Sequence, residues 1–161
     1  MTPNTLTGAA AVPQSFASLH YHFVFSTKHR EPLLLADLRL RLFDYLGGIL
    51  KANDGCLVAA GGVEDHVHLL AGLGRETSVA DALRLIKANT SKWLHDVNLA
   101  PPHFAWQAGY AAFTVSRSQM PVVEAYLANQ EEHHRTQSFQ DEYRALLLRH
   151  DIEFDERYLW D

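Results

Sequence analysis

The stretch Glu64-Asp65-His66-Val67-His68-Leu69-Leu70 predicts the strand around which the rest of the chain is arranged. Successive side chains of a strand point to opposite faces, so His66 and His68 share one face while Val67 points to the other. Two imidazoles held side by side on a rigid strand form half of a metal site. A lone His-x-His pair is more often an ordinary pair of polar residues, so the metal interpretation depends on the rest of the chain.

The composition is that of a single globular domain. The 161 residues are enough to bury a core without metal or disulfide staples, and the fractions of hydrophobic (47%) and charged (20%) residues are ordinary. Cys56 is the only cysteine, which excludes an internal disulfide and favours a reducing, cytoplasmic location. No apolar run approaches membrane-spanning length, so no membrane partner is expected.

The charge neither favours nor excludes a nucleic-acid partner. The formal net charge of −5 argues against phosphate binding, which requires a basic surface. Residues 151–161 carry −4 of this total, so residues 1–150 carry only −1. The ten histidines, or a bound divalent ion, could add positive charge locally.

The order of predicted elements indicates an α+β fold. Period-two and helical hydrophobic patterns alternate as strand, helix, strand, strand, helix, strand. The predicted elements are a strand at 19–26, a helix opened by Pro32, strands at 56–60 and 66–73, a helix from Ser78 to about Val97, and a strand at 112–116. This is the βαββαβ order of a ferredoxin-like sandwich, with an antiparallel sheet, two helices on one face and the first and third strands central.

Two further helices are predicted after the last strand, at about 120–134 and 139–149. We expect residues 1–14 to be a flexible tail, 15–150 to be the single domain, and 151–161 to be an acidic and aromatic tail that packs on a neighbouring surface.

The first C-terminal helix can supply the second half of a site. The spacing of Tyr126 and Gln130 places both on one helical face, and His134 continues that face one turn later. Taken alone, Tyr126 is better explained by a half-buried core position and Gln130 by a solvent-facing one. Beside the histidines the pair gains a chemical meaning, because a cation near a phenol of pKa about 10 favours the phenolate and polarises a phosphoryl oxygen.

Several side chains are candidates for contact with DNA. Lys28 and Arg30 end the first strand and could meet a phosphate, although from the sequence alone a solvated loop is the better explanation. Arg84 and Lys87 share a face of the second helix that would suit a nucleic-acid backbone, and Trp106 could stack on an unpaired base. Each of these residues also has an ordinary structural explanation.

From about residue 15 to the C-terminus, the chain resembles the single-tyrosine HUH transposases of small bacterial insertion sequences, the insertion-sequence-200-like group. The matching stretches are 25–32 (FSTKHREP), 61–70 (GGVEDHVHLL), 91–93 (SKW), 106–110 (WQAGY), 126–134 and 155–160 (DERYLW). The resemblance implies an HUH endonuclease domain in which a late helix carries the tyrosine.

The resemblance also implies a DNA transposition and recombination activity on single-stranded DNA, at hairpin ends of a mobile element. In such enzymes a tyrosine attacks a phosphodiester, becomes joined to the 5′-phosphate and frees a 3′-hydroxyl that later reseals the DNA. Carried onto this chain, Tyr126 is the nucleophile, His66 and His68 bind a divalent metal ion (Mg²⁺ or Mn²⁺), and Gln130 is the third ligand. The family also implies a homodimer.

Some assignments stay open. Glu64 shares strand parity with the two histidines, so Glu64 and His134 are candidates for a metal or phosphate contact. A replication-initiator or relaxase-like nickase would use the same motifs, although positions 129 and 130 hold no second tyrosine. A non-catalytic or host-adopted DNA-binding protein derived from such a transposase would keep the same fold. A ferredoxin-like metal-binding domain with a small-molecule partner is a third possibility.

Overall fold

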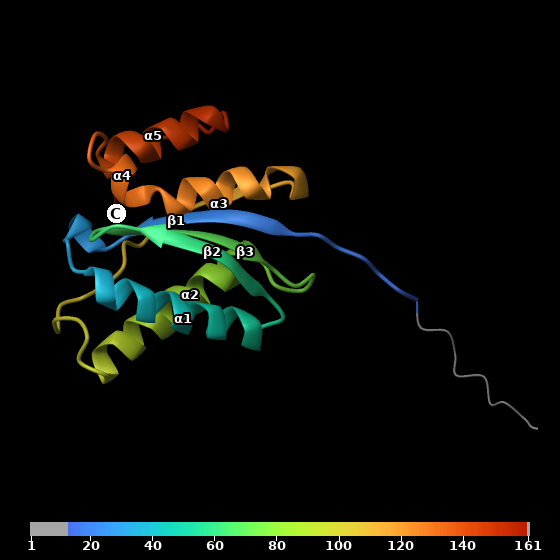
Figure 1. Cartoon of the computed structure of the whole chain (residues 1–161), viewed down its shortest axis with the longest axis horizontal. Coiled ribbons are helices and arrows are strands. Elements are labelled where there is room, and N and C mark those ends of the chain that lie inside the picture. Colours follow the sequence, from blue (N-terminus) through green and yellow to red (C-terminus); the bar gives the residue numbers. More distant parts are fainter. Residues whose placement is uncertain (1–12, 161) are drawn as a thin grey trace, which may run out of the picture.

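A four-stranded antiparallel sheet separates two layers of helices (Figure 1). The computed structural model describes residues 13–160, so the predicted tail at 1–14 lies almost wholly outside the described residues. The strands are β1 (His20–Ser26), β2 (Cys56–Gly62), β3 (His66–Gly72) and β4 (Ala111–Thr114). Their spatial order is β2-β3-β1-β4, with β3 and β1 central. The predicted ferredoxin-like sandwich with an antiparallel sheet is therefore confirmed.

The two helical layers come from different parts of the chain. Helices α1 (Ala36–Ala52) and α2 (Val79–Asp96) cover one face, and α3 (Met120–Ala128), α4 (Gln130–His133) and α5 (Phe139–Arg149) cover the other (Figure 1). Two short 3-10 helices, η1 (Lys28–Arg30) and η2 (Arg117–Gln119), follow β1 and β4. Within residues 13–160, no helix combines the length and the apolar character that crossing a bilayer requires.

Strand β3 places its side chains alternately in the two layers, as the period of two requires. Val67 and Leu69 are fully buried in the large core beneath α1 and α2. Leu70 belongs to a separate cluster with residues of α3. His66 and His68 share the parity of Leu70, so the core packing of Val67 and Leu69 fixes both imidazoles on the face covered by α3–α5.

Two predicted helices differ from the observed ones: one begins later than predicted, and the other is divided into two. The helix expected from Pro32 begins at Ala36, because the preceding segment is extended and the Leu34 N–H donates to the Glu64 carbonyl at 2.8 Å. The helix expected at 120–134 is broken at Asn129, whose φ of −100° and ψ of 13° separate α3 from α4.

The C-terminal segment packs back onto the domain. Phe154, Leu159 and Trp160 lie against a cluster that α5 forms with β1 and β4. Arg144 of α5 pairs with Glu156 and lies 5.1 Å from the Trp160 ring. These contacts help to hold α5 against the sheet.

The close approach of α3 to β2 gives a testable prediction. A Cβ on Gly61 would lie 2.0 Å from the Leu127 carbonyl oxygen, a backbone atom that cannot yield alone. We expect Gly61→Ala to push α3 off the sheet and to lower the free energy of unfolding by about 1–3 kcal/mol in urea titrations. The control is Gly48→Ala in α1, where a Cβ would meet nothing within 4 Å. That control should be neutral or stabilising by up to about 1 kcal/mol, and equal stability of the two variants would contradict the packing.

Candidate active site

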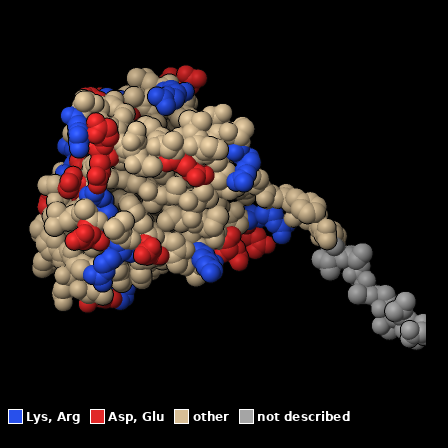
Figure 2. Space-filling model, viewed as in Figure 1, with Lys and Arg blue, Asp and Glu red and all other residues tan. Residues whose placement is uncertain are grey.

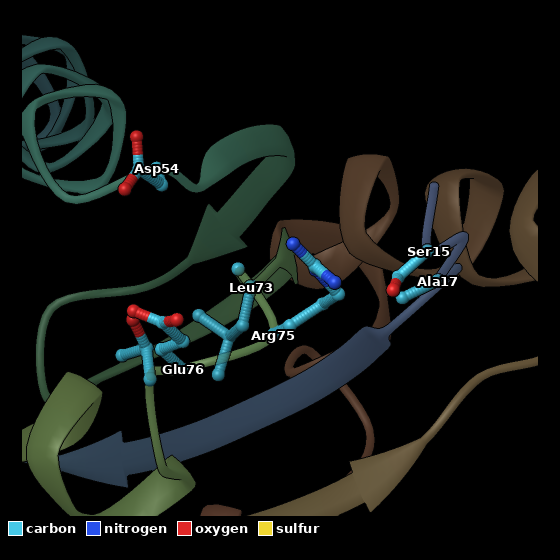
Figure 3. Close-up of a pocket in the computed structure, with 8 residues that line it drawn as sticks. Ser15, Ala17, Asp54, Leu73, Arg75 and Glu76 are labelled. Atoms are coloured by element: carbon cyan, nitrogen blue, oxygen red, sulfur yellow. The ribbon is translucent and has the colours of Figure 1, made fainter. Parts of the chain in front are cut away.

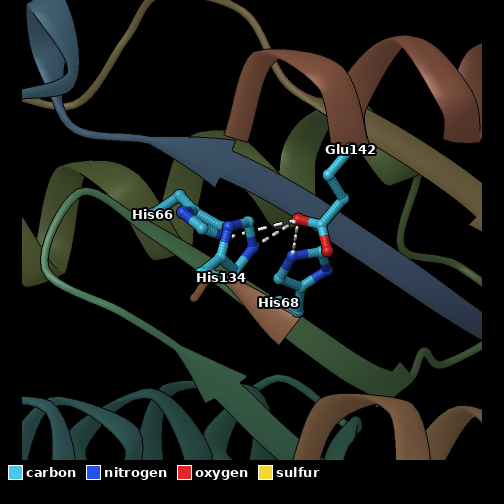
Figure 4. Close-up of side chains that lie close together, drawn as sticks. All are labelled: His66, His68, His134 and Glu142. Carbon is cyan, nitrogen blue, oxygen red and sulfur yellow. Dashed lines mark hydrogen bonds and ion pairs between the residues drawn. The ribbon is translucent and has the colours of Figure 1, made fainter. Parts of the chain in front are cut away.

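Side chains from β3, α5 and the residue after α4 converge above the sheet. His66 and His68 rise from β3, His134 follows α4, and Glu142 descends from α5 (Figure 4). One nitrogen or oxygen atom from each of the four lies within 4.8 Å of the others. The Glu142 Oε1 atom is 2.8 Å from His68 Nε2, 3.0 Å from His134 Nε2 and 3.4 Å from His66 Nε2. We call these four residues the His–Glu cluster.

Tyr126 and Gln130 meet the same carboxylate from α3 and α4. The Tyr126 hydroxyl donates a hydrogen bond to Glu142 Oε2, and the Gln130 Nε2 group donates to the same oxygen at 3.1 Å. The Gln130 Oε1 atom lies 3.3 Å from His66 Nε2. The structure therefore brings Tyr126, Gln130, His134 and the histidine pair together within a single chain.

The Nδ1 atoms of His66 and His68, which point away from Glu142, also have hydrogen-bond partners. Asp65 Oδ1 lies 2.7 Å from His66 Nδ1, and His22 Nε2 shares a 2.8 Å hydrogen bond with His68 Nδ1. These contacts aim both Nε2 atoms into the cluster. Burial lowers the pKa of His68 to about 4 and that of His22 to about 3. Burial acts in the same direction on His66, but hydrogen bonds with Asp65 and Glu142 outweigh it and raise the pKa.

The cluster leaves Glu142 ionised and Tyr126 protonated. Burial would raise the pKa of Glu142, but hydrogen bonds from His134, His66 and His68 outweigh burial and lower it strongly. The pKa of Tyr126 is raised, first by burial and then by the Glu142 carboxylate. The phenol therefore needs an added positive charge before it can become a good nucleophile near neutral pH.

The arrangement fits a divalent metal ion. Its donor atoms are imidazole nitrogens, a carboxylate oxygen and a carboxamide oxygen, a mixture that suits Mn²⁺ and its neighbours better than Mg²⁺, which prefers oxygen alone. The Nε2 atom of His133 is also buried at this site, 3.3 Å from Glu142 Oε2, and within residues 13–160 it is the buried side-chain nitrogen without a hydrogen bond.

Two candidate residues do not reach the cluster. Glu64 lies in the turn before β3 and is exposed, because the strand starts only at His66, so the parity argument does not extend to it. Trp106 is only 8% exposed, donates from Nε1 to Thr90 Oγ1 and packs on Phe25 in the core. The hypothesis that Trp106 stacks on a base is wrong for this structure, because its ring faces are not open.

The basic candidates lie on two sides of the molecule. Lys28 and Arg30 follow β1 at the end where Ser26 pairs with His66, so they flank the cluster. Arg84 and Lys87 are on α2, across the sheet from Tyr126. Arg84 pairs with Asp81, and the half-buried Lys87 ammonium donates to the carbonyls of residues 108 and 109. Figure 2 shows positive and negative side chains interspersed on one face of the molecule, with no large area of one sign.

Two cavities differ in their relation to the cluster. A groove of about 470 Å³ between α3 and α5 is lined by Tyr126, His22, Phe113, Arg149 and His150 together with neighbouring apolar and uncharged polar residues. Another cavity, of about 490 Å³, lies at the far end of β3 beside Arg75 and Glu76 (Figure 3). None of the predicted site residues lines the second cavity. Three further cavities do reach the site: one is lined by Glu64 and His134, one by Gln130, and one by Tyr126 and His133.

Glu142 is a site residue that the sequence patterns did not predict. It lies on the same helical face as Phe139, Tyr143 and Leu146, which are buried in the structure. A carboxylate in the apolar stripe of an amphipathic helix is unusual, because burying a charge without partners is costly. That position was the available signal that Glu142 has buried, polar partners.

Comparison with known proteins shows which family this chain resembles. The family profile described as "Transposase IS200 like" matches residues 15–130. The ISDra2 transposase TnpA of Deinococcus radiodurans is 23% identical over 120 residues, which cover 70% of this chain and 84% of that protein. A crystal structure from Deinococcus radiodurans R1, described as a transposase, has a TM-score of 0.59 and 27% identity and covers 74% of this chain and 95% of its own.

A second solved structure shares the fold. It is described as the REP-associated tyrosine transposase bound to a REP hairpin, and it has a TM-score of 0.57 and 13% identity. The match covers 76% of this chain and 73% of that one.

Proposed function

This chain belongs to the IS200-like transposase family, and on that premise we propose that it cleaves and rejoins single-stranded DNA through Tyr126. The observation that carries the proposal is the contact of the Tyr126 hydroxyl with a buried cluster containing His66 and His68. A nucleophile, two strand imidazoles and a carboxamide within one hydrogen-bonded group are what a tyrosine-dependent phosphodiester transfer requires.

In the proposed reaction the Tyr126 oxygen attacks phosphorus, and the hydroxyl proton passes to solvent water. The bond from phosphorus to the 3′-oxygen breaks, and that oxygen leaves as a 3′-hydroxyl after taking up a proton. The product is a 5′-phosphotyrosine ester that keeps the energy of the broken bond, so a 3′-hydroxyl can later attack it and reseal DNA without another energy source. When bound, a divalent ion would favour the phenolate and polarise a phosphoryl oxygen.

The ion site is proposed to contain His66 and His68 as nitrogen donors and Gln130 as a neutral oxygen donor. Asp65 and His22 hold the two rings so that their Nε2 atoms face the site. We propose Mn²⁺ or Mg²⁺ as the ion, and the imidazole donors favour Mn²⁺ of the two.

The groove between α3 and α5 offers the DNA a route to Tyr126. The tyrosine ring is part of the lining, which combines aromatic and apolar side chains with uncharged polar ones, and Arg149 supplies a positive charge. An unpaired nucleotide is amphiphilic in the same way, because its base is planar and its phosphate is anionic. Lys28 and Arg30, at the neighbouring end of β1, are proposed to meet phosphates further along the strand.

We propose that the DNA is a hairpin end of a mobile element, as the hairpin in the solved relative suggests.

The homodimer implied by the family stays a prediction, and the contacts of Tyr126 support a site completed by the tyrosine of the same subunit. The lone cysteine supports a cytoplasmic location. A non-catalytic DNA-binding protein derived from a transposase is the competing function, and the intact cluster argues against it.

A comparison of two variants tests the third ligand. We expect Gln130→Ala to reduce metal-dependent cleavage by about 10-fold or more, because Gln130 is buried and touches both His66 and Glu142. Glu64→Ala should change cleavage little, because Glu64 is exposed in a turn. The measurement is the rate of adduct formation on single-stranded oligonucleotides from DNA flanking the gene, at several Mn²⁺ concentrations. The opposite ranking would overturn the assignment of Gln130.

A further inference from the structure

Glu142 is a buried charge that the proposed function does not yet use. Its side chain is 2% exposed, and it is the only buried acidic residue in the part of the chain that the structure describes. A carboxylate in such a place is tolerated only when both oxygens are fully partnered. The groups that contact the Glu142 carboxylate therefore indicate its role in the site.

The two carboxylate oxygens face different groups. Oε1 faces the imidazoles, at 2.8 Å from His68 Nε2 and 3.0 Å from His134 Nε2. Oε2 accepts hydrogen bonds from the Tyr126 hydroxyl and from Gln130. The Glu142 side chain therefore contacts both the imidazoles of the His–Glu cluster and the Tyr126 hydroxyl.

The spacing around Oε1 is that of ligands sharing one ion. Donor atoms that each lie about 2.1 Å from a metal are separated from one another by roughly 3.0–3.4 Å. The Oε1 atom lies 2.8 to 3.4 Å from the Nε2 atoms of His66, His68 and His134. An ion could therefore be accommodated among these atoms with small side-chain movements.

We propose that Glu142 is itself a ligand of the ion through Oε1 and that Oε2 positions the Tyr126 hydroxyl beside it, with His134 as a further nitrogen ligand. This inference rests on the proposed function and extends it beyond the family match, which ends at residue 130. Helix α5 is then part of the active site, because it delivers the only anionic ligand. With several imidazoles and one carboxylate, the site should bind Mn²⁺ or Co²⁺ in preference to Mg²⁺.

The test measures metal binding directly. The full-length, metal-free protein is titrated with MnCl₂, and binding is followed by calorimetry and by the loss of the electron paramagnetic resonance signal of free Mn²⁺. We expect Glu142→Gln, which keeps the size but removes the charge, to weaken Mn²⁺ binding about 10-fold or more. His134→Gln should weaken it as well. The matched control is Glu124→Gln, a carboxylate on α3 outside the cluster, which should bind Mn²⁺ like the wild type.

A second readout separates a ligand from a structural residue. The visible absorption of bound Co²⁺ reports the atoms around the ion, so Glu142→Gln should change the spectrum in protein that remains folded by circular dichroism. Unchanged Mn²⁺ affinity with an unchanged Co²⁺ spectrum would overturn the inference, and tighter binding would make Glu142 a competitor of the ion. If His66→Ala abolishes binding while Glu142→Gln does not, this inference falls and the proposed function stands. A wild-type protein that binds no Mn²⁺ would overturn both.

Discussion

Replacing Tyr126 by phenylalanine is expected to abolish the covalent protein–DNA adduct, with a loss of about 10³-fold or more in the rate of strand cleavage. The change removes one oxygen atom and leaves the ring, which lies edge-on to His22 and His68 at centroid distances of 6.1 and 5.7 Å. The fold should therefore persist, and DNA binding should stay near the wild-type level. The measurement is a denaturing gel of labelled single-stranded oligonucleotides from DNA flanking the gene.

Tyr143→Phe is the matched control for this experiment. Tyr143 is a buried tyrosine, one residue after Glu142 on α5, but it packs with Phe139 and Trp160 away from the imidazoles. This control should form the adduct at the wild-type rate. An adduct that survives in Tyr126→Phe and disappears in Tyr143→Phe would move the nucleophile to α5 and refute the proposed function. Persistent DNA binding without any adduct in the wild type would instead favour a non-catalytic DNA-binding protein.

Removing an imidazole from β3 should also reduce strand cleavage strongly. His68 is fully buried and contacts both Glu142 and His22. We expect His68→Ala to lose cleavage by about 10²-fold or more, because an ion ligand and its support disappear together. In the wild type, EDTA should stop cleavage and added Mn²⁺ should restore it, whereas Mn²⁺ should not rescue the variant.

His103→Ala controls for the loss of a histidine as such, because His103 is exposed and pairs with Glu31 away from the cluster. It should cleave like the wild type. Circular dichroism and thermal unfolding of His68→Ala show whether the fold is kept. Undiminished cleavage in EDTA, or in folded His68→Ala, would refute a metal-dependent mechanism.

The sequence was sufficient to predict the features that follow from local periodicity. Alternation along β3 placed His66 and His68 on one face. A four-residue spacing placed Tyr126 and Gln130 on one face of a predicted helix, and in the structure both reach the cluster, from α3 and from α4. The order of elements was sufficient for the sheet topology, because each strand and helix has a clear hydrophobic period.

Features that depend on tertiary packing could not be predicted in this way. Glu142 reaches the site only because α5 folds back over the sheet, and no local period indicates where a helix after a loop will dock. The break at Asn129 separates α3 from α4, although Tyr126, Gln130 and His134 keep a four-residue helical spacing in the sequence. Trp106 was compatible with a surface role, and only the fold places the Thr90 hydroxyl and the Phe25 ring around it. In each case the deciding contact depends on how separate elements pack.

The attachment point of DNA on the protein tests the central claim most directly. Wild-type protein is incubated with a cleavable single-stranded oligonucleotide and Mn²⁺, digested with protease and nuclease, and studied by tandem mass spectrometry. We expect a nucleotide linked through its 5′-phosphate to the peptide that contains Tyr126, and no such product in EDTA. A nucleotide on another residue, or the same product without metal, would contradict a Tyr126 nucleophile acting beside an ion held by His66 and His68.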